Sequence, residues 1–249
     1  MMKLISNLSR GAALAVAGTL LLPAVTFAAP KTDKQSGFCK GLAARAAAAQ
    51  DQTNNFEAKV KQTWATQDQT QAVQAQSVDS AVASQRAEAD TKLETELAKV
   101  EAAATTNSQK QAVATYRAAV KKAVADRRAA YDAARQTFRA GVSAATQSQR
   151  QSALNKIAAY KASSAEALAS ASSTCGSAGT TDASIRSNLK AALKENHQDF
   201  KAQEKTKPAG QQVKSLAQAR KDAFKAADDA FNKAMAAAHD QLKAALTNE

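Results

Sequence analysis

Hydrophobic and small residues recur every three to four positions along most of the chain, and this pattern predicts long amphipathic helices near the coiled-coil period. The first run of the pattern extends from Leu42 to Ala104, and no glycine or proline occurs between Leu42 and Ala140. Over residues 66–76 the pattern lapses into glutamine, threonine and aspartate. We therefore expect a first helix over residues 38–105, with loose packing in the polar stretch.

A second helix is predicted over residues 108–173. The polar residues 105–108 interrupt the first run, and Ser108 with Gln111 has the spacing of a capping box, in which two side chains satisfy free backbone N–H groups. The hydrophobic pattern then resumes and continues to the end of this region. The two helices should therefore form an antiparallel hairpin that turns near Asn107.

A third helical segment is predicted over residues 182–247, with Asp182 as its N-cap. This segment is expected to be broken between Pro208 and Gly210, because proline has no backbone N–H and its ring clashes with the preceding turn. The break either kinks the helix or reverses the chain, and a reversal would give a shorter four-helix section. Without a reversal, the segment is long enough to lie along both arms of the hairpin.

The two cysteines, Cys39 and Cys175, test the hairpin independently. In an antiparallel hairpin, two residues at one level have a mean residue number equal to the turn position. The mean for these cysteines is 107, the position at which the capping residues place the turn. Their Cα atoms would then lie within the ~7 Å that a disulfide requires. We predict a Cys39–Cys175 disulfide; two free or metal-bound thiols are the alternative.

The same rule for levels in an antiparallel hairpin applies to a second turn, predicted near residue 178. It places three interruptions of the helical pattern at one level. These are Thr66 in the polar stretch, Ser148 as a second capping residue, and Pro208. We expect a shared bend or a flexible section of the bundle where they meet.

Residues 1–28 have the build of a secretory signal peptide: two basic residues, an apolar run, and small residues before a cut after Ala28. An uncleaved N-terminal membrane anchor is the alternative, although the apolar run is barely long enough to span a bilayer. Residues 29–36 form a short polar lead-in, and residues 37–249 form a single elongated helical bundle. The mature chain is expected outside the cytoplasm, in the periplasm, at the cell surface or secreted, where disulfides persist.

The composition favours the same architecture. Hydrophobic residues make up 45% of the chain but aromatics only 4%, because much of the apolar content is alanine. Alanine has the highest helix propensity and buries little apolar area, so a thick globular core is excluded. The fold class expected is all-α, an elongated antiparallel bundle of three long, coiled-coil-like helices.

The net charge of +12 falls to +10 without the signal peptide, and it is unevenly placed. Residues 29–106 contain 9 basic and 10 acidic residues, whereas residues 107–175 contain 11 basic and 3 acidic ones. A basic helix attracts polyanions and anionic lipid. The candidate anion-binding residues are Lys110, Arg117, Lys121, Lys122, Arg127, Arg128, Arg135 and Arg139. The alternative, which we favour, is that these bases pair across the turn with Glu88, Asp90, Glu94, Glu96 and Glu101.

Few residues have a pattern that indicates catalysis. His197 and His239 share no helical or hairpin spacing that could complete a metal site. Ser187 and Lys190 match the short Ser-x-x-Lys string of penicillin-binding enzymes, but the companion motifs of those enzymes are missing. We therefore expect no enzyme activity, no cofactor, no metal and no small-molecule substrate.

Three functions remain as hypotheses. The first is an exported, non-enzymatic helical rod that acts as a structural, spacer or partner-binding protein of the cell envelope or surface, bound to a protein or an envelope polymer. The second is an extracytoplasmic holdase-type chaperone; in being exported, basic and helical the chain is similar to the Skp-like periplasmic chaperones, with no shared motif. The third is binding of polyanions or anionic membrane surfaces through the basic second helix. Self-association through an alanine-rich face is compatible with all three.

Overall fold

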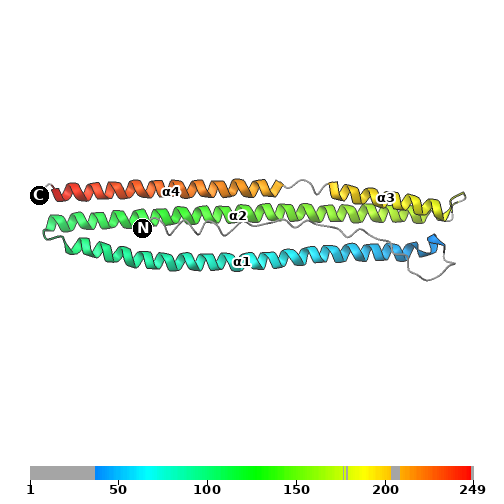
Figure 1. Ribbon diagram of the computed structural model, residues 1–249, viewed down its shortest axis with the longest axis horizontal. Helices are drawn as coiled ribbons and strands as arrows, with labels where there is room; N and C mark the ends of the chain where they lie inside the picture. Colours follow the sequence, from blue (N-terminus) through cyan, green and yellow to red (C-terminus); the bar gives the residue numbers. More distant parts are fainter. Residues whose placement is uncertain (1–36, 176, 178, 203–207, 248–249) are drawn as a thin grey trace. The chain divides into compact units, whose positions relative to one another are not determined.

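The computed structural model describes residues 37–175, 177, 179–202 and 208–247, and in this part of the chain every regular element is a helix (Figure 1). The elements are a short 3₁₀ helix η2 (Phe38–Gly41) and the α-helices α1 (Leu42–Ala102), α2 (Asn107–Thr174), α3 (Asp182–Ala202) and α4 (Pro208–Thr247). The all-α expectation is confirmed, with four helices that pack against one another. The predicted signal peptide and lead-in lie outside the described residues. No described helix is long and apolar enough to cross a membrane.

The turn between α1 and α2 is capped by residues other than those predicted. The backbone N–H of Gln109 donates to Oγ1 of Thr106 at 3.1 Å, and Oε1 of Gln109 accepts the N–H groups of Thr105 and Thr106 at 2.9 and 3.2 Å. This is a capping box two residues earlier than the predicted Ser108–Gln111 pair. As a result α1 ends at 102 rather than 105, and α2 begins at 107 rather than 108.

The predicted break between Pro208 and Gly210 is wrong in its position. Pro208 is the first residue of α4 and Gly210 lies in the first turn of that helix. Proline suits the first helical position because its missing N–H would have no partner there. Residues 203–207 lie outside the described residues. Beyond Gly210, α4 runs antiparallel to α2, with Leu216 beside Gly141 and Phe224 beside Tyr131. A reversal at Pro208 would have placed α4 beside α3, which does not fit these contacts.

The chain divides into two compact units. Unit 1 comprises Met1–Gln62 and Gln151–Gly210, and unit 2 comprises Thr63–Arg150 and Gln211–Glu249. All three divisions fall within four residues of Thr66, Ser148 and Pro208.

Unit 1 has two apolar clusters. The first surrounds the disulfide and is formed by six buried residues of η2, α1, α2 and α3, which are Phe38, Leu42, Leu168, Ala171, Ile185 and Leu189. The second holds Ile157, Tyr160 and Phe200, with Phe56 packed against it. The rings of Tyr160 and Phe200 meet edge to face, with their centroids 5.7 Å apart, a favoured aromatic geometry.

Asp182 was predicted to cap its own helix, but its carboxylate caps η2 instead. The backbone N–H of Phe38 donates to Oδ2 of Asp182 at 2.6 Å. The N-cap contact of α3 is made by Thr181, whose Oγ1 accepts the backbone N–H of Ser184 at 3.2 Å. A Cβ on Gly37 would lie 2.9 Å from Oδ2 of Asp182, so only glycine allows this approach. The contact fixes the start of η2 against α3.

Unit 2 packs α4 onto α2 through small residues and aromatic rings. The rings of Tyr131 and Phe224 are stacked, with centroids 4.2 Å apart and planes at 5°. Ten residues further along α2, a Cβ on Gly141 would lie 2.7 Å from a methyl group of Leu216. The close approach of α2 and α4 therefore depends on glycine at this position.

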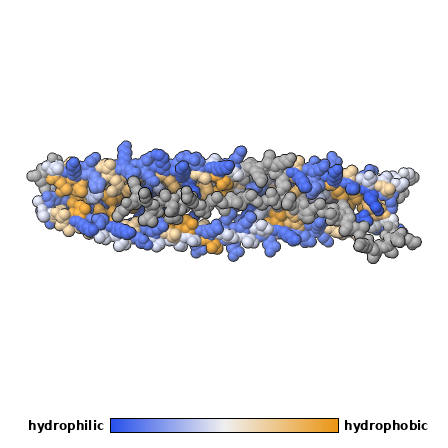
Figure 2. Space-filling model, in the orientation of Figure 1, coloured by the Kyte–Doolittle hydropathy of each residue, from blue (hydrophilic) through white to orange (hydrophobic). Residues whose placement is uncertain are grey.

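Hydrophilic side chains dominate the face shown in Figure 2, and hydrophobic ones appear as small separate patches. Among the described residues, the large apolar side chains classed as exposed are Val73, Val78 and Leu246. The first two lie in and just after the polar stretch of α1, where the hydrophobic pattern lapses. That stretch is helical nevertheless, as its glutamine- and alanine-rich composition favours.

Candidate functional site

Eight ion pairs among the described residues join α1 to α2, and we call the five of them that recur at a regular interval the charge ladder. In each ladder pair the acid lies on α1 and the base on α2: Glu57–Lys161 in unit 1, and Asp68–Arg150, Asp79–Arg139, Asp90–Arg128 and Glu101–Arg117 in unit 2. In the three aspartate pairs both carboxylate oxygens accept bonds from both terminal guanidinium nitrogens, at 2.7–2.9 Å. Such bidentate pairs specify orientation as well as distance.

The ladder follows an eleven-residue repeat. Successive acids on α1 and successive bases on α2 are each eleven positions apart, and every pair is centred on residue 109. Eleven residues make three helical turns at about 3.67 residues per turn, close to the 3.6 of an α-helix, so each charge returns to the same face. Two antiparallel helices with the same repeat therefore stay in register from one pair to the next.

The disulfide closes the hairpin in the same register. The sulfur atoms of Cys39 and Cys175 are bonded at 2.06 Å, and their Cα atoms lie 5.8 Å apart. This pair is centred on residue 107, the predicted turn position and two residues from the centre of the ladder. The covalent link and the ion pairs therefore select the same alignment of α1 with α2.

Most of the predicted anion-binding residues have an acidic partner. Seven of the eight are ion-paired, and among the described residues only Lys110 of this set has no ion pair. Arg117 and Lys121 share Glu94, and Lys122 pairs within its own helix with Asp126. This arrangement agrees with the favoured alternative, in which the bases of the second helix are neutralised within the molecule.

The acids proposed for this pairing behave unequally. Asp90, Glu94 and Glu101 contact bases of α2 as expected. Glu96 instead pairs with Lys99 of its own helix, and Glu88 has no ion pair among the described residues. The remaining ladder acids, which are Glu57, Asp68 and Asp79, were not predicted from the sequence. Their recurrence at intervals of eleven is visible in the sequence and was the available signal.

The ladder bases hold their carboxylates in the charged form. Hydrogen bonding to Arg150 lowers the pKa of Asp68 below its ordinary value, and hydrogen bonding to Arg139 does the same for the pKa of Asp79. Hydrogen bonds from Lys161 and then from Lys61 lower the pKa of Glu57 to about 2. These three carboxyl groups are therefore ionised at neutral pH.

Between α2 and α4 the charges meet around an aromatic stack. The Tyr131 hydroxyl donates to Asp228 at 2.8 Å, and the Arg127 guanidinium donates to the same carboxylate at 2.7 Å. Burial, followed by the hydrogen bond to Asp228, raises the pKa of Tyr131. The Arg127 guanidinium also lies over the ring of Phe231, 5.0 Å from its centroid. This cluster attaches α4 to α2 and has the character of a packing contact.

Neither histidine lies in a metal-binding cluster. Within the described residues no three histidine, cysteine or acidic side chains are grouped as ligands. His239 of α4 contacts Tyr116 of α2, with 3.3 Å between Nε2 and the phenolic oxygen.

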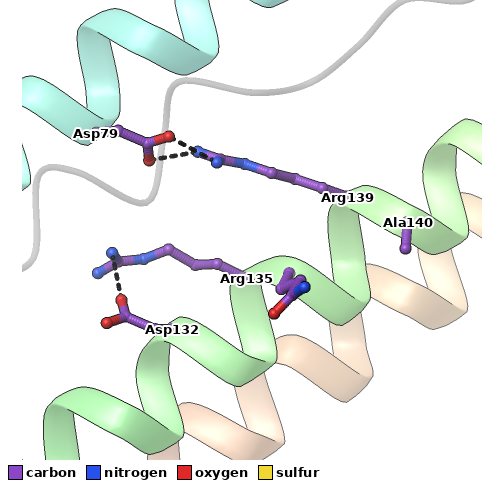
Figure 3. Close-up of a pocket in the computed structure, with 6 residues that line it drawn as sticks. Asp79, Asp132, Arg135, Arg139 and Ala140 are labelled. Carbon is purple, nitrogen blue, oxygen red and sulfur yellow. Dashed lines mark hydrogen bonds and ion pairs between the residues drawn. The ribbon is translucent and has the colours of Figure 1, made fainter.

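One open pocket of about 420 Å³ lies in unit 2 beside the ladder pair Asp79–Arg139 (Figure 3). Four of its six lining residues are charged; the full set is Asp79, Asp132, Arg135, Gln136, Arg139 and Ala140. Arg135 and Arg139 extend side by side from α2, and Arg139 reaches Asp79 on α1. The lining thus combines two guanidinium groups and an amide with two carboxylates.

Comparison with known proteins finds no matching family model, no matching curated protein and no matching solved structure.

Proposed function

We propose that this protein is an exported, non-enzymatic helical protein that acts as a spacer or partner-binding element of the cell envelope or cell surface. The observation that supports the proposal is the charge ladder. Its bidentate pairs recur at a fixed interval on two helices of 61 and 68 residues, and the disulfide has the same register. A repeat of this kind specifies geometry over a long distance, which is what a spacer requires.

We also propose the architecture expected from the sequence, an elongated antiparallel bundle of three long helical segments, with α3 and α4 as the third. At ~1.5 Å per residue, a straight helix of 61 residues extends about 90 Å. Small-angle X-ray scattering on the mature chain tests this directly. A thin rod of that length has a radius of gyration of about 26 Å, whereas a compact domain of this size has about 17 Å. A value near the smaller figure would remove the basis of the spacer role.

The function itself is tested by comparing three assays on one preparation of disulfide-intact mature chain. A spacer should fractionate with the envelope and form specific cross-links there. It should leave the aggregation of a chemically denatured client unchanged at equimolar ratio. It should also elute from heparin at or below physiological salt, because its bases are already paired.

Each rival hypothesis has a distinct result. Suppression of aggregation at equimolar ratio would establish the holdase and contradict the spacer. Retention on heparin that falls steeply with salt would support polyanion binding through α2. Lys122→Glu with Arg128→Glu is the informative variant in that case, since unchanged retention would dismiss α2 as the binding surface.

A further inference from the structure

Arg135 occupies a position on α2 that is otherwise apolar or uncharged. Residues at intervals of eleven lie on the same face of a helix. At other positions on the face that contains Arg135, α2 has the buried apolar residues Val113, Ile157 and Leu168. The Arg135 side chain is accordingly only 24% exposed. A guanidinium that is this far removed from water needs a counter-charge.

The counter-charge available to Arg135 is incomplete. Among the described residues its one ion pair is with Asp132 of its own helix, through a single nitrogen at 3.3 Å. Asp132 is already held by Arg86 of α1, which donates to both of its oxygens at 2.7 and 2.9 Å. The neighbouring Arg139 donates to both oxygens of Asp79, and the charge of Arg135 acts on that carboxylate without a hydrogen bond between them. Most of the five N–H donors of Arg135 therefore remain open.

A further arginine adds to the positive charge. Arg220 of α4 lies over the ring of Phe138, with 4.2 Å from the guanidinium carbon to the ring centroid, and it has no ion pair among the described residues. Burial, and after it the charge of Arg135, lowers the pKa of Arg220. In this section of unit 2, two aspartates, Asp79 and Asp132, face four arginines. Two of the four positive charges therefore have no matching negative charge. The arginines are Arg86, Arg135, Arg139 and Arg220.

We propose that the pocket lined by Arg135, Gln136 and Arg139 binds a phosphate-type dianion, either as free phosphate or as the phosphate group of a larger molecule. Arg135 is the principal ligand, because its open donors match the geometry of a phosphate oxygen pair. The Gln136 amide supplies a further donor at the pocket wall. This binding is additional to the spacer role and does not depend on it.

Titration calorimetry on the disulfide-intact mature chain tests the site, with inorganic phosphate as the probe and ionic strength held constant with chloride. We expect saturable binding of one phosphate per chain. A parallel titration with glycerol 3-phosphate separates the two sources. Comparable affinity for the ester indicates the phosphate group of a larger molecule, and binding of phosphate alone indicates the free ion.

The decisive variant is Arg135→Leu, with Arg135→Gln measured alongside. Leucine suits the apolar face that Val113 and Ile157 share, so the variant should fold with an unchanged or higher melting temperature. Phosphate affinity should fall at least ten-fold in both variants. Lys122→Gln is the matched control, because it removes one charge from the same helix at a side chain that is 75% exposed. It should leave phosphate binding unchanged.

Three results would overturn the proposal. They are the lack of saturable phosphate binding by the native chain, equal binding by folded Arg135→Leu, and an equal loss in Lys122→Gln. The last would show that phosphate responds to net charge and not to this pocket.

Discussion

Removing the disulfide should cause a large loss of stability. The bond links residues 136 positions apart. For a loop of this length the chain-entropy relation gives about 5 kcal/mol at 25 °C, through restriction of the unfolded chain. Replacing Cys39 and Cys175 by serine leaves the surrounding apolar cluster of unit 1 in place. The loss should therefore approach this value, and it should originate mainly in the unfolded state.

Urea unfolding followed by circular dichroism measures this loss. The oxidised native chain, the same chain with reductant, and the double serine variant should be compared, and the last two should coincide. Hydrogen exchange should report faster opening in the first turns of α1 and the last turns of α2. A decrease in the free energy of unfolding below about 1 kcal/mol, at equal denaturant slope, would refute the reasoning, because the hairpin would then be held closed without the bond.

Three further results are expected. A double-mutant cycle with Asp68→Ala and Arg150→Ala should give a coupling of about 0.5 kcal/mol that declines with salt, since the aspartate side chain is 55% exposed; a coupling of zero would show that the ladder does not stabilise the fold. Because the folded pKa of Glu57, about 2, is depressed from 4.5, its contribution to stability is present above pH 4.5 and is lost toward pH 2. The melting temperature should fall over that window, and less steeply in Glu57→Gln; an identical slope would contradict the assignment. Gly141→Ala should destabilise by about 1–3 kcal/mol through its clash with Leu216, whereas Gly210→Ala, with open space around it, should be neutral or stabilising. Equal unfolding midpoints for the two variants would mean that the packing of α4 on α2 does not require glycine at position 141.

The sequence predicted the helices and their alignment because these depend on signals spread over many residues. Long runs without glycine or proline leave little alternative to helix, and the two cysteines determine a single hairpin register. The choice of cap was not predictable in the same way. Thr106, Asn107 and Ser108 can all cap a helix, and the choice is decided by local geometry, here by the side chain of Gln109.

The ladder was not predicted because periodicity was sought only among apolar positions, whereas charges were counted by segment. At intervals of eleven residues, the sequence has an acid at every ladder position of α1 and a base at every ladder position of α2. The same interval would have singled out Arg135 as a charge on an apolar face. The incomplete pairing of that arginine could not have been found, because it depends on Arg86 reaching Asp132 from another helix. Pro208 was misjudged because a proline that starts a helix and one that breaks a helix have the same local sequence.

The separation of opposite charges onto different helices also limits how copies of this protein can associate. Two α1 helices aligned in the ladder register would set acid against acid, so like helices repel. Two chains that exchanged arms would nevertheless retain every acid–base pair. The four residues between Ala102 and Asn107, closed by the Thr106–Gln109 cap, are therefore the part of the sequence that favours a hairpin within one chain over an exchanged dimer.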